Sequence, residues 1–464
     1  MQRGFDCALH QHDCVGQLCD ASGLVLLHYF TRTDLPLGHF KFAVKRGAVG
    51  HRGLAQRSVA QAAFSAQRQL SRHNGIILIC DKEAMKSESE PAAATLRGVG
   101  IFQPQFVEFG GEERVILSLS RELHRQGREH FVMCYQDHIG LATHADWPLK
   151  VYELSPCGTG IARLLALRRA VRLLHQTGQP VPVLFNIQAA YHAGLVVGAP
   201  YHLRIPDTFS LLAYVPETAK EPVALRASLK TVVSGFVAHA ATRRGIRNAQ
   251  ALVTNTRALR DEMNSLYGRA AEVIYLGGFG DPIERASKPP VPPVELLSVS
   301  RLQTSKRIDW MLRSLAALDG KTVPAWRLHV AGTGPESDAL RNLAIDLGIS
   351  DRVVFHGFVS DEKLAALYAN SHVFLMPAKQ GFGLPAIEAV YQRMVVVVSE
   401  ESGVIELLAD TPWAVIAQAG EEGFARALAA YLQQRVATHD FSSPLPQLPT
   451  EAAWAQQVIR YCNW

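Results

Sequence analysis

Two cations five residues apart follow the end of a predicted strand in the second half of the chain. Arg301 and Lys306 come after the apolar segment 295–300, and a helix is predicted over 307–318. Arginine can bind a phosphate through two N–H groups, lysine acts as a point charge, and a helix N-terminus adds partial positive charge. The pattern indicates a phosphate-binding site, although a solvated basic loop would have the same spacing.

A loop with two glycines follows another predicted strand, 373–376. Gly381 and Gly383 let the backbone approach a ligand and expose its N–H groups, and the helix that begins near Pro385 offers more donors. Glu388 lies one turn inside this helix, where its carboxylate could accept hydrogen bonds from sugar hydroxyls. An ordinary surface glutamate is the alternative interpretation.

Other chemical patterns are weaker. Glycine turns at 110–111 and 332–334 join predicted strands to helices and are either tight turns or ligand loops. The chain has no Asp-x-Asp sequence and no obvious Ser-His-Asp or Cys-His set. The spacing of Cys7, Cys14 and Cys19, near His10 and His12, fits none of the standard zinc pairs, so free thiols and no metal site are expected.

The strands and helices that must position these residues alternate along the chain. Predicted strands lie at 98–102, 131–135, 181–185, 251–254, 272–275, 295–300, 327–331, 352–355, 373–376 and 394–398. Strands separated by helical patterns favour parallel, doubly wound sheets, which bind ligands at the carboxyl ends of their strands. We therefore expect an α/β fold of two doubly wound Rossmann-like domains facing across a cleft, with an N-terminal extension.

Breaks in these patterns suggest the domain boundaries. The expected parts are an N-terminal extension, 1–98, an acceptor domain, 99–280, a proline-rich linker, 281–294, a nucleotide-sugar domain, 295–449, and a C-terminal helix, 450–464. The extension has strand-like segments at 25–27 and 75–79, a polar helix pattern at 54–72 and a linker composition from 85. It is either an accessory domain or a product of a wrongly assigned start, with Met85 as the natural first residue.

Bulk composition excludes several classes of protein. The 464 residues are 48% hydrophobic and 19% charged, and no stretch approaches the ~20 apolar residues of a membrane-spanning helix. The pI of 8.8 is below that of dedicated nucleic-acid binders. With no secretory pattern at the N-terminus, these features predict a cytoplasmic protein that does not bind nucleic acid.

Taken together, residues 295–407 resemble the donor-binding domain of the GT-B glycosyltransferases of the family-4 (glycosyl transferases group 1) type. The matching segments are Ser300–Leu302 with Lys306, Gly332–Glu336, Arg352–Val359, Leu367–Pro377, Gly381–Ala389 and Gly403–Glu406. In the first domain, Gly110–Val115 resembles the family's first glycine loop and helix. The resemblance covers roughly residues 99–464.

The resemblance implies a role for each matched residue. Arg301 and Lys306 would bind the donor diphosphate, and Glu388 would bind the ribose. The other implied substrate-binding positions are Gly111 at the diphosphate, Phe358 and Val359 beside the base, Gly381, Phe382, Gly383 and Leu384 at the sugar and phosphate, and Asp207 in the first domain. The family transfers sugars with retention of configuration and needs neither metal nor cofactor.

Three positions depart from the family. Gln380 stands where a glutamate is usual, eight residues before Glu388, and is expected at the catalytic centre as an uncharged hydrogen-bonding group. Pro206 replaces a histidine before Asp207, with His202 and Arg204 nearby, and Arg393 replaces a glycine. The expected activity is hexosyl transfer from a nucleotide diphosphate sugar to a hydroxyl acceptor. The alternatives are a weak or inactive homologue that binds nucleotide sugar as a subunit, and a sugar phosphorylase or epimerase of the same fold.

The acceptor is predicted to be a carbohydrate or a lipid-linked intermediate, as in polysaccharide or lipopolysaccharide biosynthesis. The segment 160–175 has the pattern of a basic amphipathic helix. Its arginines, Arg163, Arg168, Arg169 and Arg172, would either contact anionic lipid at the inner face of the membrane or form an ordinary solvated face.

Overall fold

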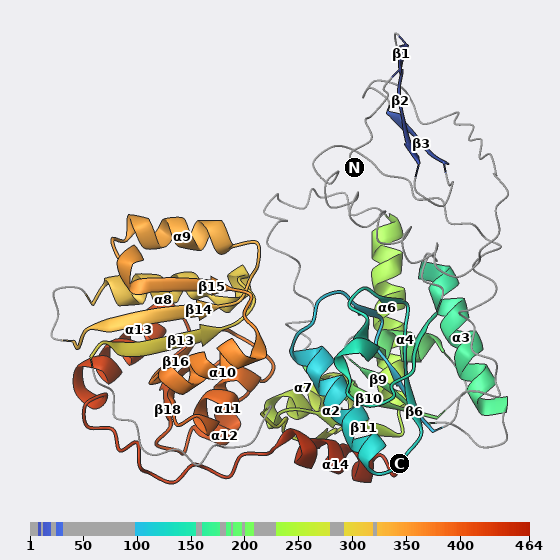
Figure 1. The fold of residues 1–464 in the computed structure, drawn as a ribbon. Helices are drawn as coiled ribbons and strands as arrows, with labels where there is room; N and C mark the ends of the chain where they lie inside the picture. The colour runs from blue at the N-terminus through green and yellow to red at the C-terminus, as the bar shows by residue number, and fades with distance from the viewer. Residues whose placement is uncertain are drawn as a thin grey trace. The chain divides into compact units, whose positions relative to one another are not determined.

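In a computed structural model the chain divides into two compact units, Met1–Asp81 and Lys82–Trp464. The described residues are three strands in the first unit and, in the second, 98–154, 160–176, 182–186, 189–196, 200–207, 229–278, 292–318 and 323–464. The predicted helix 54–72, strand 75–79, the linker from 85, the side chains of the cysteine–histidine cluster and most of the proline-rich linker lie outside the described residues. The three strands of the first unit are β1 (Ala8–His10), β2 (Asp13–Cys19) and β3 (Val25–Phe30), which pair antiparallel (Figure 1).

The first sheet of the second unit has seven parallel strands in the order β12-β11-β10-β9-β4-β6-β8. Their bounds are β4 Val99–Phe102, β6 His130–Cys134, β8 Val151–Glu153, β9 Val183–Asn186, β10 Tyr201–Ile205, β11 Ala251–Thr254 and β12 Glu272–Val273. The predicted strands of this region are confirmed, whereas β8 and β10 were not predicted. The chain runs from β4 through the next helix to β6, which lies on one side of β4, whereas β9 lies on the other side of β4. The winding therefore reverses between β4 and β9.

Helices connect the strands of this first sheet. They are α2 (Gly111–Arg125), α3 (Gly160–Gln176), α4 (Ala189–Leu195), α6 (Leu229–Asn248) and α7 (Arg257–Tyr267), with a 3₁₀ turn η3 (Leu141–His144) and a small parallel pair, β5 (Gln105–Phe106) and β7 (Gln136–Asp137). Helix α2 buries one apolar face against the sheet, as its 3.6-residue period requires. Its first turn carries acidic residues and its last turn basic ones, which matches the helix dipole.

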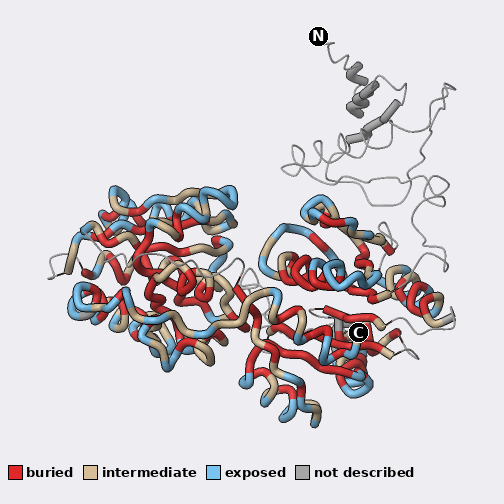
Figure 2. Tube along the Cα trace, turned by 60° about the horizontal axis from the view of Figure 1, so that its bottom comes forward, coloured by how far each residue is buried: buried red, intermediate tan, exposed pale blue. Residues whose placement is uncertain are grey.

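The second sheet has six parallel strands in the order β15-β14-β13-β16-β17-β18. They are β13 Val294–Val299, β14 Trp326–Ala331, β15 Val353–Gly357, β16 Val373–Met376, β17 Val395–Ser399 and β18 Ala414–Ala417. Every residue of β16 and β17 is buried, because helices cover both faces of a parallel sheet. The winding reverses between β13 and β16, and the traces of both sheets run mainly through buried residues (Figure 2).

Helix α8 (Ile308–Ala316) packs against α9 (Ser337–Asp346) and α13 (Glu421–Ala430), and α13 contacts β17 and β18. Helix α10 (Asp361–Asn370) contacts β13, and α11 (Leu384–Tyr391) contacts β16 and β17. The remaining elements are α12 (Ile405–Leu408), the 3₁₀ turns η5 (Thr304–Lys306) and η6 (Ser350–Arg352), and the π-helical turn η7 (Tyr431–Arg435). The predicted strands and helices over 295–398 are confirmed. β18, α12 and α13 were not predicted.

The C-terminal helix α14 (Glu451–Tyr461) packs against α2 of the first sheet (Figure 1). Glu451 accepts hydrogen bonds from Ser118 Oγ (2.8 Å) and from Arg121 Nη1 (2.5 Å), and the Trp454 side chain is buried. The chain therefore crosses back to the first sheet after completing the second. None of the described helices has the length and hydropathy that a membrane span requires.

Candidate functional site

The switch point of the second sheet brings together two residues far apart in the chain. Lys306 ends η5, which follows β13, and Gln380 follows β16, the strand next to β13. The Nζ of Lys306 donates a hydrogen bond to Oε1 of Gln380 over 2.9 Å. Ligands of doubly wound sheets bind at this point, because the crossovers diverge there and leave the strand ends uncovered.

The Lys306 ammonium faces a neutral amide where the family resemblance implies a carboxylate. Burial and the charge of Arg301 lower the pKa of Lys306, and the carboxylate of Asp207 opposes this shift. Lys306 therefore lies within electrostatic reach of both groups. A bound anion would supply the counter-charge that Gln380 does not carry.

The glycine loop after β16 contacts the end of β10 from the first sheet. The Gly381 N–H donates to Oδ1 of Asp207 over 3.1 Å. A Cβ on Gly381 would lie 2.0 Å from that oxygen and 2.5 Å from the carbonyl oxygen of Pro206, so only glycine fits. Burial and the nearby Glu112 raise the pKa of Asp207, while Arg204 and Lys306 oppose the rise.

Gly383 gives the loop its second special conformation. Its φ is +117°, and a Cβ there would lie 2.8 Å from Cε of Met376 and 2.9 Å from Nε2 of Gln380. Phe382 is buried, and its carbonyl accepts a hydrogen bond from Ser402 Oγ over 2.8 Å. These contacts set the direction of the N-terminus of α11, which begins at the next residue.

The N-termini of α2 and α11 approach each other. A Cβ on Gly111, the first residue of α2, would lie 4.0 Å from Cδ1 of Leu384, the first residue of α11. The Gly110 N–H donates to Oε2 of Glu113 over 3.1 Å, and burial raises the pKa of Glu113. Two helix N-termini side by side form an electropositive region that favours an anion.

Arg301 and Phe358 project into solvent. Arg301 Nη1 lies 3.6 Å from Oε2 of Glu108, and both side chains are more than half exposed. Such a pair contributes little to stability, so Arg301 is available to a ligand. Phe358 is 84% exposed, whereas Val359 packs against the hydrophobic core.

Glu388 lies in α11 and is held by a buried tyrosine. The Tyr368 hydroxyl donates to Oε2 of Glu388 over 2.8 Å. Burial and the Glu388 charge raise the pKa of Tyr368 well above its ordinary value. Tyr368 therefore stays protonated and orients the carboxylate. The structure thus joins Lys306, Gln380, Gly381 and Asp207 by direct contacts, and Gly111 approaches Leu384 across the two helix ends.

Several polar residues beside this site were not predicted. In the first sheet, Gln103, Glu112, Asn186 and Arg204 form a hydrogen-bonded network at the β4–β9 switch point. A charged residue inside the strand Tyr201–Ile205 was the available signal, because buried strands are otherwise apolar. In the second sheet, Arg307 Nη1 donates to the Pro377 carbonyl (3.1 Å) and to Oε2 of Glu401 (2.5 Å), which fixes the loop after β16.

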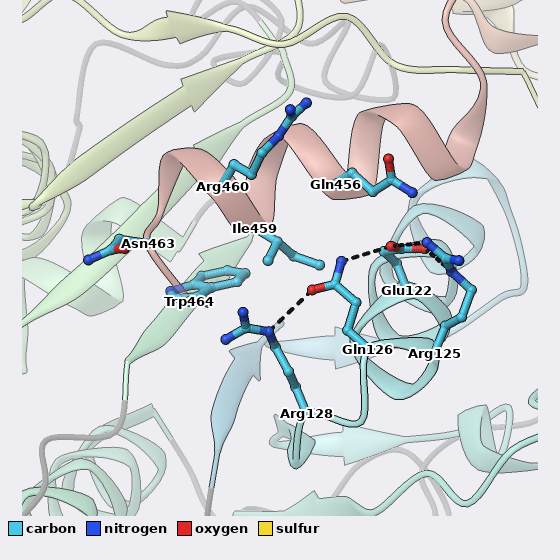
Figure 3. A pocket seen from close by; sticks show the side chains of 9 residues that line it. All are labelled: Glu122, Arg125, Gln126, Arg128, Gln456, Ile459, Arg460, Asn463 and Trp464. Atoms are coloured by element: carbon cyan, nitrogen blue, oxygen red, sulfur yellow. Dashed lines mark hydrogen bonds and ion pairs between the residues drawn. The ribbon is translucent and has the colours of Figure 1, made fainter.

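A separate cavity of about 510 Å³ lies between the C-terminal ends of α2 and α14 (Figure 3). It is lined by Glu122, Arg125, Gln126, Arg128, Gln456, Ile459, Arg460, Asn463 and Trp464. Arg125 is paired with Glu122, and Arg128 Nε donates to Gln126. At 1.5 Å per residue this cavity lies about 20 Å along α2 from Gly111. It is therefore not the site at the strand ends.

Residues 281–443 match the protein family described as Glycosyl transferases group 1. The chain is 33% identical over 114 residues to an uncharacterized glycosyltransferase of Methanocaldococcus jannaschii, covering 24% of this chain and 29% of that protein. It is 28% identical over 229 residues to a GDP-mannose-dependent alpha-(1-6)-phosphatidylinositol monomannoside mannosyltransferase of Mycolicibacterium smegmatis, covering 43% and 59%. The matches span less than two thirds of the length of either relative.

Solved structures resemble the fold over a larger share of the chain. The lipopolysaccharide outer core galactosyltransferase WaaB, in its apo form, has a TM-score of 0.58 at 15% identity, with 78% of this chain and 98% of that chain covered. Anabaena Alr3699/HepE in complex with UDP and glucose has a TM-score of 0.59 at 18% identity, with 79% and 100% covered. These matches confirm the predicted GT-B fold.

Proposed function

We propose that this protein transfers a hexose from a nucleotide diphosphate sugar to a hydroxyl acceptor, with retention of configuration, because residues 281–443 match the glycosyl transferases group 1 family. The observation that carries the proposal is the Lys306–Gln380 hydrogen bond at the sheet switch point. A cation, a glycine loop and two helix N-termini meet there, and a diphosphate is the ligand that this chemistry suits.

We assign the donor to the second sheet and the acceptor to the first, with 99–280, 281–294 and 295–449 as acceptor domain, linker and donor domain. Lys306 and Arg301 would neutralise the diphosphate, the N–H groups of Phe382, Gly383 and Leu384 would bind its oxygens and the sugar, and Glu388 would bind the ribose. Phe358 offers an exposed ring for the nucleotide base. No metal or cofactor enters this scheme, because fixed cations and dipoles stabilise the leaving diphosphate.

The chemical step would occur on one face of the sugar. The acceptor oxygen forms a bond to the anomeric carbon as the bond to the diphosphate breaks, and the departing phosphate oxygen takes the acceptor proton. Gln380, held by Lys306, would hydrogen-bond the sugar without adding negative charge beside the leaving group. Asp207, which touches Gly381, would complete the site from the first domain.

Replacing Arg301 with alanine is expected to weaken binding of UDP or GDP. A charge-assisted hydrogen bond contributes about 1.5–3 kcal/mol, which corresponds to about a 10–150-fold change in affinity. Isothermal titration calorimetry with UDP and GDP measures the change, and the exposed Arg426 of α13 supplies a control substitution. Unchanged affinity in the Arg301 variant would contradict the assignment of the diphosphate to this location.

A second candidate function is a nucleotide-sugar-binding subunit with little or no catalysis. The neutral Gln380 and the Pro206 that replaces the family's histidine favour it. Incubation with GDP-mannose and UDP-hexoses, with alkyl glycosides as acceptors, separates the two functions. Release of nucleotide supports the transferase, whereas tight binding without release under any condition supports the subunit.

A lipid-linked acceptor would place the protein at the inner face of a membrane, and α3 is the surface that we assign to this contact. Its exposed residues include Ile161 (76%) and Leu165 (59%), followed by Arg168, Arg169 and Arg172 on the same side. Apolar and basic side chains on one helix face suit an anionic membrane. Arg163 was predicted to belong to this face, but it lies 5.6 Å over the Tyr135 ring.

Reversing the charges of Arg168, Arg169 and Arg172 to glutamate is expected to abolish binding to vesicles of anionic phospholipid. Each basic residue near such a surface contributes about 1 kcal/mol, so three reversals remove the attraction and add repulsion. Co-sedimentation with these vesicles measures the effect, and neutral phosphatidylcholine vesicles serve as the control. Equal binding by the variant would exclude α3 as the contact.

A further inference from the structure

A buried arginine lies in the strand that leads to Asp207 of the proposed site. Arg204 lies in β10, whose residues are all buried, and is itself 1% exposed. Its Nη1 donates to Oε2 of Glu112 over 2.6 Å and to Oδ1 of Asn186 over 2.7 Å. Its guanidinium carbon lies 5.6 Å from the ring centroid of Trp454 in α14. Arg204 thus joins three segments around a single carboxylate.

Glu112 is that carboxylate, and its position creates an electrostatic conflict. It is the second residue of α2, directly after Gly111, and its side chain is 31% exposed. The helix dipole stabilises a carboxylate there, but the same end of α2 faces Leu384 and the proposed diphosphate. The charge of Glu112 contributes to raising the pKa of Asp207, which touches Gly381, so its field reaches the glycine loop.

A contribution to fold stability does not by itself explain why an arginine is buried at position 204. Within the described residues, its Nε and Nη2 are buried and have no hydrogen-bond partner. A buried cation with unpaired N–H groups is commonly no more stabilising than an apolar side chain of the same size. The two hydrogen bonds that Nη1 does make hold Glu112 and Asn186 in place, which points to a role in the charge balance of the site.

We propose that Arg204 is a positioning residue that draws the Glu112 carboxylate away from the donor and neutralises it, so that the adjoining N-termini of α2 and α11 stay electropositive. The inference rests on the proposed function, since it concerns binding of the same diphosphate. In this scheme Arg204 would touch neither nucleotide nor sugar. It acts through Glu112, and Asn186 supports it with a second hydrogen bond to the same guanidinium nitrogen.

The test is a double-mutant rescue with UDP and GDP as ligands. The nucleotide used is the one that the wild type binds. At an ionic strength of about 0.1 M, Arg204→Met is expected to lower the affinity for it by about 10-fold, because the released Glu112 carboxylate repels the diphosphate. Adding Glu112→Gln is expected to restore the affinity to within about 3-fold. The loss should shrink at about 1 M salt, where charges are screened within about 3 Å.

Arg121→Met is the matched control. Arg121 also pairs with a carboxylate, that of Glu451, and lies 5.3 Å from the Trp147 ring centroid, but it is on the outer part of α2, about 15 Å from Gly111. This variant should bind nucleotide like the wild type. If Arg204→Met binds normally, or if the double variant stays as weak as Arg204→Met, the inference is overturned.

The same experiment separates failure of the inference from failure of the proposed function. A wild-type protein that binds neither nucleotide contradicts the proposed function and, with it, the inference. If Arg204→Met does not fold, as thermal unfolding would show, Glu112→Gln alone decides the question. It should bind at least as tightly as the wild type, and weaker binding would overturn the proposal.

Discussion

Replacing Lys306 with alanine is expected to lower kcat by about 100- to 1000-fold while leaving the protein folded. Loss of one preorganised donor at a developing negative charge typically has an effect of this size. The Nζ of Lys306 donates a hydrogen bond to Gln380 at the sheet switch point, so its position is already fixed in the proposed site. Steady-state nucleotide release from the preferred donor measures the effect.

A pH profile makes this prediction more specific. Burial and the charge of Arg301 lower the pKa of Lys306 in the free protein. As the pH is raised, Lys306 should therefore lose its proton, and the protein its affinity for nucleotide, at a lower pH than if this lysine were exposed. The affinity is highest below that pKa and falls as the pH rises through it. Lys150→Ala is the control, because Lys150 is an exposed lysine directly before β8. If the Lys306→Ala variant had the kcat of the wild type, the proposed role of Lys306 in the mechanism would be wrong.

Replacing Gly381 with alanine is expected to lower kcat/KM by at least about 100-fold. The new Cβ would lie 2.0 Å from Oδ1 of Asp207 and 2.5 Å from the Pro206 carbonyl oxygen. Since a carbonyl oxygen of the backbone cannot rotate away, the loop or the end of β10 must move. A displacement of about 1 Å in reacting groups can reduce the rate by about 100-fold.

The control is a glycine-to-alanine substitution at a position where the added methyl group has space. Gly160 begins α3, and a Cβ there would have no neighbour within 4 Å. Gly160→Ala should therefore retain activity and thermal stability. If Gly381→Ala were as active as Gly160→Ala, the contact between the glycine loop and Asp207 would not be part of the working enzyme.

Much of the site could be placed from local sequence alone. Apolar runs such as 394–398 predict strands buried on both faces, and a cation or glycine after each strand indicates the carboxyl edge of the sheet. Gly381 and Gly383 were predicted to let the backbone approach a ligand, which stays a prediction. The structure shows that a Cβ at either position would meet other atoms of the protein, so a side chain is excluded there. The strand assignments are confirmed because they depend on local apolar patterns, and the edge at which these residues lie follows from strand direction, which a βαβ connection determines.

Other features could not be predicted because they depend on which segments meet. The Lys306–Gln380 bond requires β13 and β16 to be neighbours, and the Gly381–Asp207 contact joins residues of different sheets. Short strands such as β8, with half-buried residues and only a few positions, carry too little periodicity to be recognised.

The amino-acid sequence by itself determined the alternation of strands and helices, the resemblance of residues 281–443 to a glycosyltransferase family and the positions of the cations and glycines, since each depends on residues close together in the chain. Only the tertiary structure decided which charges pair. In the structure Tyr368 donates a hydrogen bond to Glu388, and Arg204 donates one to Glu112. Trp454 of the last helix lies against Arg204 of the first sheet. The physical reason is that a buried charge is stabilised by whatever group packing brings within hydrogen-bond distance, and that partner can come from any part of the chain.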